Sequence, residues 1–277
     1  MRHGLICLAV AVAAVVPVFG GPISVNLNSA SSFALLGGTI SNTGTSNIVG
    51  NVGAPTKWTD YGTWSVAGTV YPWPSDPTVA AAYSDFKAAF TAAMLLSSTQ
   101  SLTDLTTSQT FIGDNVYTFT DPSISTTTGI NLTFDAENHP NDVFVIRISD
   151  ALTVNGAMTF TLKNGAQPGN IFWIVGTDAT ISVGSAGPID FYGDILAGDT
   201  FTMSAAEGGS GVLAGTINGC VFAENANTLA GTTDVEGCNS AAPGGDSGSV
   251  PEPGTLPLLS MGLGAGFLLL RKFRPIR

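Results

Sequence analysis

The chain has 277 residues, of which 44% are hydrophobic and only 10% are charged, and its formal net charge is −11. The apolar content argues against a disordered chain, and the length allows one or two domains with a sizeable core. An acidic chain poor in cations lacks the basic surface that displaces phosphate counterions, so nucleic-acid binding is excluded.

The N-terminus has the pattern of an export signal. Arg2 and His3 precede an apolar run from Leu5 to Phe19, and small glycines follow this run. A basic start, an apolar stretch and a small-residue exit are typical of a secretory signal peptide. We therefore assign residues 1–20 to a signal peptide, with a buried first helix as the alternative.

Aromatic residues gather in the segment before the first predicted helix. Three of the four tryptophans lie between residues 54 and 76, together with Tyr61 and Tyr71. The three are Trp58, Trp64 and Trp73. We interpret the segment as a cap over one end of the fold, and an aromatic platform for sugars is the alternative.

One segment is predicted to be helical. Ser75 and Asp76 can cap a helix, and Pro77 suits its first position because the missing N–H needs no partner there. Large apolar residues then recur every three or four positions among alanines, from Val79 to Met94. This spacing predicts a helix over about 77–98, with one buried stripe.

The remaining segments are strand-like and are of two kinds. The first kind is apolar on both faces, as expected of strands covered on both sides, and comprises Val143–Ile146, Ile171–Val175, Ile195–Ala197 and Cys220–Ala223. The second kind alternates Thr or Ser with apolar residues, as expected of strands with one wet face, and comprises Met158–Leu162, Thr180–Val183, Thr200–Ser204 and Asn227–Leu229.

The two kinds of strand alternate along the chain, each recurring about every 25 residues. Such a repeat indicates a solenoid in which each turn contributes one strand to each face. Six or seven turns would match the length of the predicted helix, about 33 Å. We therefore predict an all-β fold with one long helix, a parallel β-helix with the helix packed on its doubly apolar face, and a β-sandwich is the alternative.

Two cysteines, Cys220 and Cys238, remain after removal of a signal peptide that would contain Cys7. An even number of cysteines in an exported chain predicts a disulfide, and two free buried thiols are the alternative.

Residues suited to catalysis or metal binding are scarce. The single histidine of the exported part, His139, lies among turn-forming residues and is interpreted as a solvated loop residue. The oxygens of Asp135, Glu137, Asn141 and Asp142 could hold calcium, but Pro140 stands where such a loop needs glycine. The carboxylate pair Asp190 and Asp194 lacks nearby cations for a polymer substrate. The sequence thus predicts no enzyme, no cofactor and no metal.

The wet face carries rows of uncharged Thr and Ser side chains. Threonine suits exposed strands in any case, so a purely structural role is one interpretation. The functional interpretation is that a flat grid of hydroxyls and methyls orders water, because strands about 4.8 Å apart come near the oxygen spacing of ice.

Six stretches, spread over roughly residues 24 to 236, share a recognisable pattern. They are Phe33–Gly44, Ile48–Gly53, Val116–Phe119, Asp142–Ile146, Asn164–Gln167 and Asn170–Gly176. In this order they resemble the microbial ice-binding-like (antifreeze) protein family. The resemblance implies a right-handed, discontinuous β-helix with a helix alongside, and ice binding through one flat β face. Fold membership does not by itself determine function.

The same resemblance implies the candidate ice-binding residues, which lie where the family has its Thr- and Ser-rich coils. They are Thr153, Asn155, Thr159, Thr161, Thr180, Ser182, Thr200, Thr202, Ser204 and Thr228. Two features depart from a regular face: Glu207 brings a charge near it, and Thr-x-Thr is not repeated in every turn.

The C-terminus resembles a PEP-CTERM sorting signal. Val250, Pro251, Glu252 and Pro253 precede a short apolar stretch and a basic end, and residues 239–249 form a flexible linker before them. The resemblance implies export and removal of residues 250–277 by an exosortase, and a permanent membrane anchor is the alternative. The predicted domain therefore spans residues 21–238 and lies outside the cell or at its surface.

Two functions are consistent with these features. The first is a secreted protein that adsorbs to ice and inhibits recrystallisation. The second is a structural or adhesive module of the extracellular matrix with the same fold, for which extracellular polysaccharide is a candidate partner.

Overall fold

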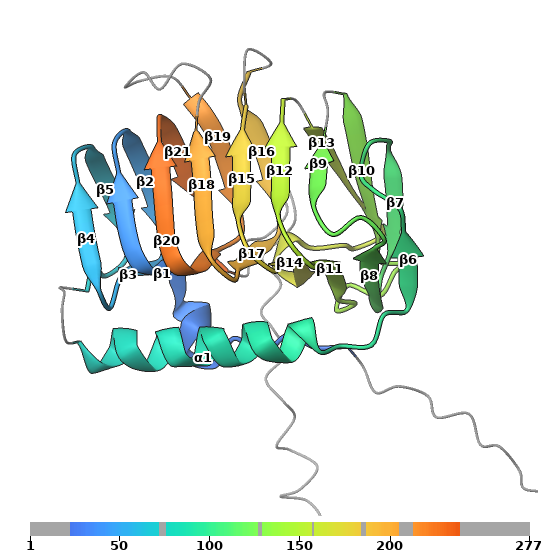
Figure 1. The fold of residues 1–277 in the computed structure, drawn as a ribbon, viewed down its shortest axis with the longest axis horizontal. Coiled ribbons are helices and arrows are strands. Elements are labelled where there is room, and N and C mark those ends of the chain that lie inside the picture. Colours follow the sequence, from blue (N-terminus) through green and yellow to red (C-terminus); the bar gives the residue numbers. More distant parts are fainter. Residues whose placement is uncertain are drawn as a thin grey trace, which may run out of the picture. The chain divides into compact units, whose positions relative to one another are not determined.

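The structure, a computed structural model, describes residues 23–71, 76–126, 129–156, 158–183, 187–204 and 213–238. The predicted signal peptide, the linker, the sorting motif, Trp73 and Glu207 lie outside these ranges. The described chain winds into stacked coils of parallel strands, and one long helix runs along one side of the stack (Figure 1).

Each full coil contributes a strand to each of three faces. We call the first the helix-covered face, because α1 (Pro77–Met94) packs against it. Its strands are β6 (Gln100–Leu102), β8 (Asn115–Phe119), β11 (Phe144–Ile148), β14 (Ile171–Val175), β17 (Asp194–Ala197), β3 (Asn51–Gly53) and the first parts of β20 (Val221–Ala230) and β1 (Phe33–Asn42). They include all four strands predicted to be doubly apolar, in β11, β14, β17 and the first part of β20, whereas the terminal β6 is exposed.

The second face, which we call the hydroxyl face, lies toward the viewer in Figure 1, and among the described residues no helix or sheet lies over it. Its strands are β9 (Ile124–Thr126), β12 (Leu152–Asn155), β15 (Ala179–Ser182), β18 (Thr200–Ser204), the second parts of β20 and β1, and β4 (Lys57–Asp60). Because β1 and β20 continue around the corner, the first two faces form a single sheet of 13 strands.

The third face is made of two sheets. One contains β7 (Gln109–Ile112), β10 (Ile130–Asp135) and β13 (Met158–Lys163). The other contains β16 (Ile189–Tyr192), β19 (Leu213–Asn218), β21 (Thr232–Val235), β2 (Thr45–Val49) and β5 (Thr63–Ala67). The sequence predicted only two kinds of face, because strands on either solvent-facing side have the same alternating pattern.

The coils are not stacked in the order of the chain. The first coils, which contain β1 to β5, lie at one end, and α1 then carries the chain to the other end, where β6 begins (Figure 1). The later coils return along the stack until β20 pairs with β1 on one side and with β17 on the other. This confirms the β-helix with a helix alongside and its discontinuous connectivity.

The interior is filled by apolar side chains that point inward from all three faces. Trp173, Phe134 and Phe191 are fully buried there, with ring centroids 5.1 Å apart for Trp173 and Phe191. A second apolar cluster lies between α1 and the helix-covered face, where Phe86 packs against Phe222 at 5.5 Å. Burial on this scale is the main stabilising contribution to such a fold.

The helix begins as predicted but ends earlier than predicted. Asp76 is the N-cap and Pro77 the first helical residue, whereas the helix ends at Met94 and not near residue 98. The Arg147 guanidinium donates to the carbonyls of Met94 and Leu96, and it therefore binds carbonyls that have no partner within the helix.

The aromatic segment is not a separate cap. Residues 57–60 and 63–67 form β4 and β5 of the terminal coil itself. Trp58 and Trp64 lie 4.9 Å apart and pack against the core, so their side chains still close this end of the interior.

The N-cap leads to a first prediction. The Asp76 carboxylate accepts a hydrogen bond of 2.8 Å from the Thr78 amide. We expect Asp76→Ala to lower the free energy of unfolding by about 1 kcal/mol, because one helical N–H loses its partner. Urea denaturation would measure the loss. Asp76→Asn retains an acceptor and should stay close to wild type; equal losses in both variants would contradict the capping role.

Candidate functional site

The hydroxyl face brings together residues from seven strands in one continuous register. One row of outward residues crosses all of these strands, and we call it the central row. It consists of Ser125, Thr153, Thr180, Thr202, Thr228, Ser41 and Thr59, in this order along the stack. Every member carries a hydroxyl group. Neighbouring members lie about 4.8 Å apart, which is the spacing of strands in a sheet.

Threonine hydroxyls of the central row are free to bind water, whereas the Ser125 hydroxyl accepts a bond of 3.5 Å from the Asn155 side chain. Those of Thr153, Thr180, Thr202 and Thr228 make no hydrogen bond to any other described residue, and all four side chains are partly exposed. Each of these threonines is β-branched and therefore restricted at χ1, so its methyl and hydroxyl groups occupy defined positions. The row is consequently a rigid, neutral line of solvent-facing hydroxyls.

The rows on either side are less regular. One contains Asn155, Ser182, Ser204 and Ala230, and its Ser182 and Ser204 hydroxyls bond each other at 3.3 Å. The other contains Thr200, Ala226, Thr39 and Lys57. Hydroxyls in these rows are partly satisfied within the protein, and alanines interrupt both rows.

Carboxylates occupy the corner between the helix-covered and hydroxyl faces. Asp178 accepts a hydrogen bond of 2.5 Å from the Thr200 hydroxyl. Asp150 accepts from Ser123 at 2.6 Å and from Thr177 at 3.0 Å, and these two bonds lower the pKa of its carboxyl group. These charges border the face without entering the central row.

The ten candidate residues do not share one face. Eight of them lie on the hydroxyl face, whereas Thr159 and Thr161 lie on β13, in the third face. The Thr161 hydroxyl donates to Asn131 at 3.2 Å and the Thr159 hydroxyl to the Ile130 carbonyl at 3.4 Å. The alternating pattern of β13 matches that of the hydroxyl face, so the sequence grouped them together.

Three members of the central row were missed by the sequence analysis. Ser125 lies one repeat before Thr153 and could have been found by extending the spacing toward the N-terminus. Ser41 and Thr59 could not have been found from the spacing, because the pairing of β1 with β20 joins residues far apart in the chain.

The third face differs from the hydroxyl face in charge. Asp190 and Asp234 project from β16 and β21, and each is paired in register with Thr216 of β19. Asp135 is in register with Lys163, and bonds from the Glu137 amide and the Asn164 side chain lower the pKa of its carboxyl group. Carboxylates therefore interrupt the rows of this face.

The remaining sites suggested by the sequence are separated or solvated. Asp190 is exposed, whereas Asp194 is buried on a different face, so the two carboxyl groups do not form a pair. His139 is exposed, and its Nδ1 lies 3.7 Å from a carboxylate oxygen of Asp142.

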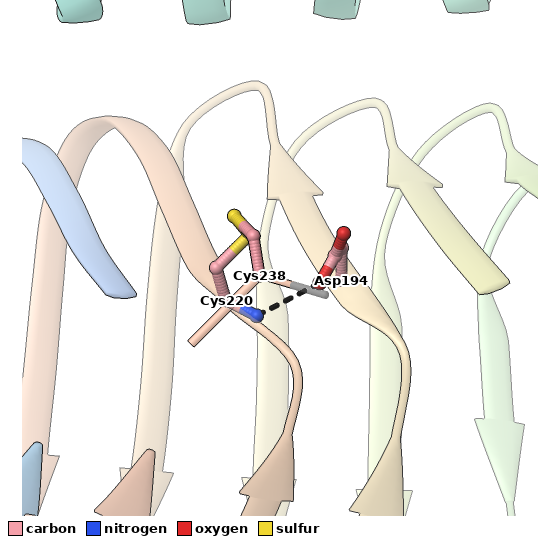
Figure 2. A group of neighbouring side chains, drawn as sticks. All are labelled: Asp194, Cys220 and Cys238. Atoms are coloured by element: carbon pink, nitrogen blue, oxygen red, sulfur yellow. Dashed lines mark hydrogen bonds between the residues drawn. A yellow bond between two sulfur atoms is a disulfide. The ribbon is translucent and has the colours of Figure 1, made fainter. Parts of the chain in front are cut away.

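Cys220 and Cys238 form the expected disulfide on the helix side of the stack (Figure 2). Asp194 lies beside it, and the ligand atoms of the three residues lie within 4.8 Å of one another. With both sulfurs in a disulfide, they are not thiolate ligands, so this group is not a metal centre in the oxidised protein.

The fold and the site define a class: a parallel β-helix with a helix alongside and a neutral, hydroxyl-bearing face. A family model described as ice-binding-like matches residues 35–234, and the PEP-CTERM protein-sorting motif matches residues 249–274. The chain belongs to the ice-binding-like family.

Relatives and solved structures agree with this assignment. An ice-binding protein of Nostoc sp. (strain HG1) is 31% identical over 253 residues, which cover 89% of this chain and 86% of the relative. The crystal structure of an ice-binding protein from Antarctomyces psychrotrophicus is similar with a TM-score of 0.61 and 26% identity, covering 80% of this chain and all (100%) of that one. An ice-binding protein domain of Shewanella frigidimarina, at 22% identity and a TM-score of 0.60, covers 79% and 99% of the two chains and shows the fold alone.

Within the described ranges, none of the helices has both the length and the hydropathy needed to cross a bilayer.

Proposed function

We propose that the protein adsorbs to ice through the hydroxyl face. The observation that carries this proposal is the central row, which runs without interruption over seven strands and whose threonine hydroxyls are not used inside the protein. A regular array of fixed methyl and hydroxyl groups can hold an ordered water layer, with each methyl enclosed by water and each hydroxyl bonded to it.

The rigidity of the array supports the proposal. The central-row side chains stand on a hydrogen-bonded sheet whose inward residues, such as Ile181, Phe201 and Leu229, are fully buried. A surface that is already ordered loses little conformational entropy when it binds, so weak contacts with water can add up to adsorption.

The other two faces are less suited to this role. Helix α1 covers the first with apolar packing. The third carries Asp135, Asp190 and Asp234, and a carboxylate orients its own hydration shell around its charge. The hydroxyl face alone combines exposure, regular register and an uncharged central row among the described residues.

We further propose that the chain is exported and that an exosortase processes its C-terminal tail. The sorting-motif match supports this. Cys238 is the last described residue and packs with the apolar cluster beside α1, away from the hydroxyl face.

The irregular rows favour a second candidate, a structural or adhesive module at the cell surface. Ala226, Ala230 and Lys57 interrupt the rows beside the central row, which narrows the regular part of the face. Such a module would use the same fold as a scaffold and bind polysaccharide or cells without binding ice.

An ice recrystallisation assay on residues 21–250 distinguishes the two. We expect the exported part to arrest the growth of ice grains at concentrations where an unrelated acidic protein of equal mass does not. If grains coarsen normally while the protein is retained by extracellular polysaccharide or by cells, the second candidate replaces the first.

A further inference from the structure

Asp194 interrupts an apolar row on the helix-covered face. Its counterparts in the neighbouring strands, in register, are Phe172, Val145 and Val116. The Asp194 side chain is only 1% exposed, and its Oδ1 accepts a hydrogen bond of 2.9 Å from the Cys220 amide. Burying a carboxyl group where the neighbouring coils bury a hydrocarbon reduces stability. Core packing therefore does not explain why an aspartate occupies this position.

The position is set by the pairing of β17 with β20. Ile195 pairs with Val221, which places Asp194 beside Cys220, and the Ile195 amide donates to the Cys220 carbonyl at 2.8 Å. The carboxyl group is thus fixed against the backbone of one disulfide cysteine, and both sulfurs lie within 4.8 Å of one of its oxygens (Figure 2).

A cavity gives this carboxyl group access to water. The cavity has a volume of about 230 Å³ and lies between Asp194, Phe172 and the N-terminal segment from Val25 to Ser31. It is large enough to hold several water molecules. Its lining contains Asn26, Asn28 and Ser31 and no other titratable group among the described residues.

The two sulfurs differ in accessibility. Cys220 is fully buried, whereas Cys238 is partly exposed. A thiolate approaching from solvent therefore meets the sulfur of Cys238, and Cys220 is the leaving sulfur. A thiolate released among apolar side chains is unfavourable unless it gains a proton at once.

Burial raises the pKa of Asp194 to about 8, so its carboxyl group is largely protonated at neutral pH. The residues that face it from the N-terminal segment, β14 and β20 are uncharged, apart from the thiols that the disulfide would release. A proton donor with a pKa close to that of a thiol is suited to this transfer.

We propose that Asp194, Cys220 and Cys238 form a thiol–disulfide exchange site for a dithiol. One thiolate of the dithiol attacks Cys238 Sγ, a mixed disulfide forms, and the electron pair of the broken S–S bond goes to Cys220 Sγ, which takes the proton of Asp194. The second thiol, once deprotonated, attacks the mixed disulfide and releases Cys238 as a thiolate, which water protonates. The protein gains two electrons, the dithiol is oxidised to its disulfide, and Asp194 regains a proton through the cavity.

The exchange would open the disulfide that holds the residue just before the C-terminal tail. The disulfide joins Cys238 to Cys220, which directly precedes β20, and Cys238 is followed by the linker that leads to the sorting motif. Opening the bond frees this end of the coil on the helix side of the stack. The hydroxyl face does not take part, so the exchange site and ice adsorption can be tested separately.

The test compares wild type with Asp194→Asn in the oxidised exported protein, residues 21–250. Asparagine still accepts from the Cys220 amide but has no proton to deliver. Asp190→Asn, an exposed carboxylate on β16, is the matched control. The measurement is the second-order rate constant of reduction, from mass spectrometry of alkylated thiols, with dithiothreitol in one arm and reduced thioredoxin in the other.

We expect Asp194→Asn to reduce at least about tenfold more slowly than wild type at pH 7, while Asp190→Asn matches wild type. Per unit of attacking thiolate, the wild-type rate should fall as the pH rises through the pKa of Asp194, because the proton donor is lost. The variant should show no such fall. A faster wild-type rate with dithiothreitol indicates a small dithiol as the physiological reductant, and a faster rate with thioredoxin indicates a protein dithiol.

Two outcomes overturn the proposal. One is an equal rate and pH profile for wild type and Asp194→Asn in both arms. The other is a wild-type rate that is independent of dithiol concentration, because reduction would then be limited by global unfolding. Reduction in urea should be equal in all variants, which confirms that any native difference comes from the folded site.

Discussion

Replacing Thr202 with tyrosine is expected to weaken inhibition of ice recrystallisation strongly. Thr202 is in the middle of the central row, between Thr180 and Thr228. A large ring there would hold ice away from several neighbouring coils at once, so at least about tenfold more protein should be needed for any effect. Tyrosine suits an exposed strand position, so stability should change little.

Thr159→Tyr is the matched control for this change. It makes the same substitution on an exposed strand position of β13, in the third face. The proposal expects it to keep full activity. Both variants should first be shown to melt within a few degrees of wild type. Loss of activity with Thr159→Tyr and retention with Thr202→Tyr would transfer the binding surface to the third face.

Truncating Phe86 to alanine is expected to cause the largest loss of stability among these variants. Phe86 is fully buried, lies in the middle of α1 and contacts Phe222 edge to face at 5.5 Å. Removing a buried phenylalanine leaves a cavity and typically lowers the free energy of unfolding by about 3–5 kcal/mol. Urea denaturation followed by circular dichroism would measure it.

Thr91→Ala, at an exposed position of the same helix, is the control and should change stability by less than about 0.5 kcal/mol. A small effect of Phe86→Ala would mean that α1 is dispensable for holding the coils together. If Phe86→Ala also loses the circular dichroism signal of the β-strands, the helix stabilises the whole stack of coils.

The sequence predicted individual elements well, because each kind of burial has its own periodicity. Ile171–Val175 and Thr200–Ser204 are strands with the predicted bounds. Asp76 and Pro77 correctly marked the start of α1. Its end was predicted too late, and the carbonyls at this end are bound by Arg147 of β11, a contact that the sequence does not reveal.

The face to which a strand belongs was harder to predict. Met158–Lys163 and Thr200–Ser204 have the same alternation of polar and apolar residues, yet they lie on different faces. Alternation reports only that one side of a strand is wet. The direction of that wet side depends on where the corners of each coil fall, and these are set by packing of the whole coil.

The sequence by itself determined the repeat, the amphipathic helix, the cysteines available for a disulfide and the supply of hydroxyl-bearing strands, because these follow from local spacing and composition. Only the tertiary structure decided that β20 lies between β17 and β1, which brings Ser41 and Thr59 into one row with Thr228. It also decided that Asp194 is buried beside the disulfide. Both depend on contacts between coils, and pairing between parallel strands distant in sequence leaves no local signal in either strand.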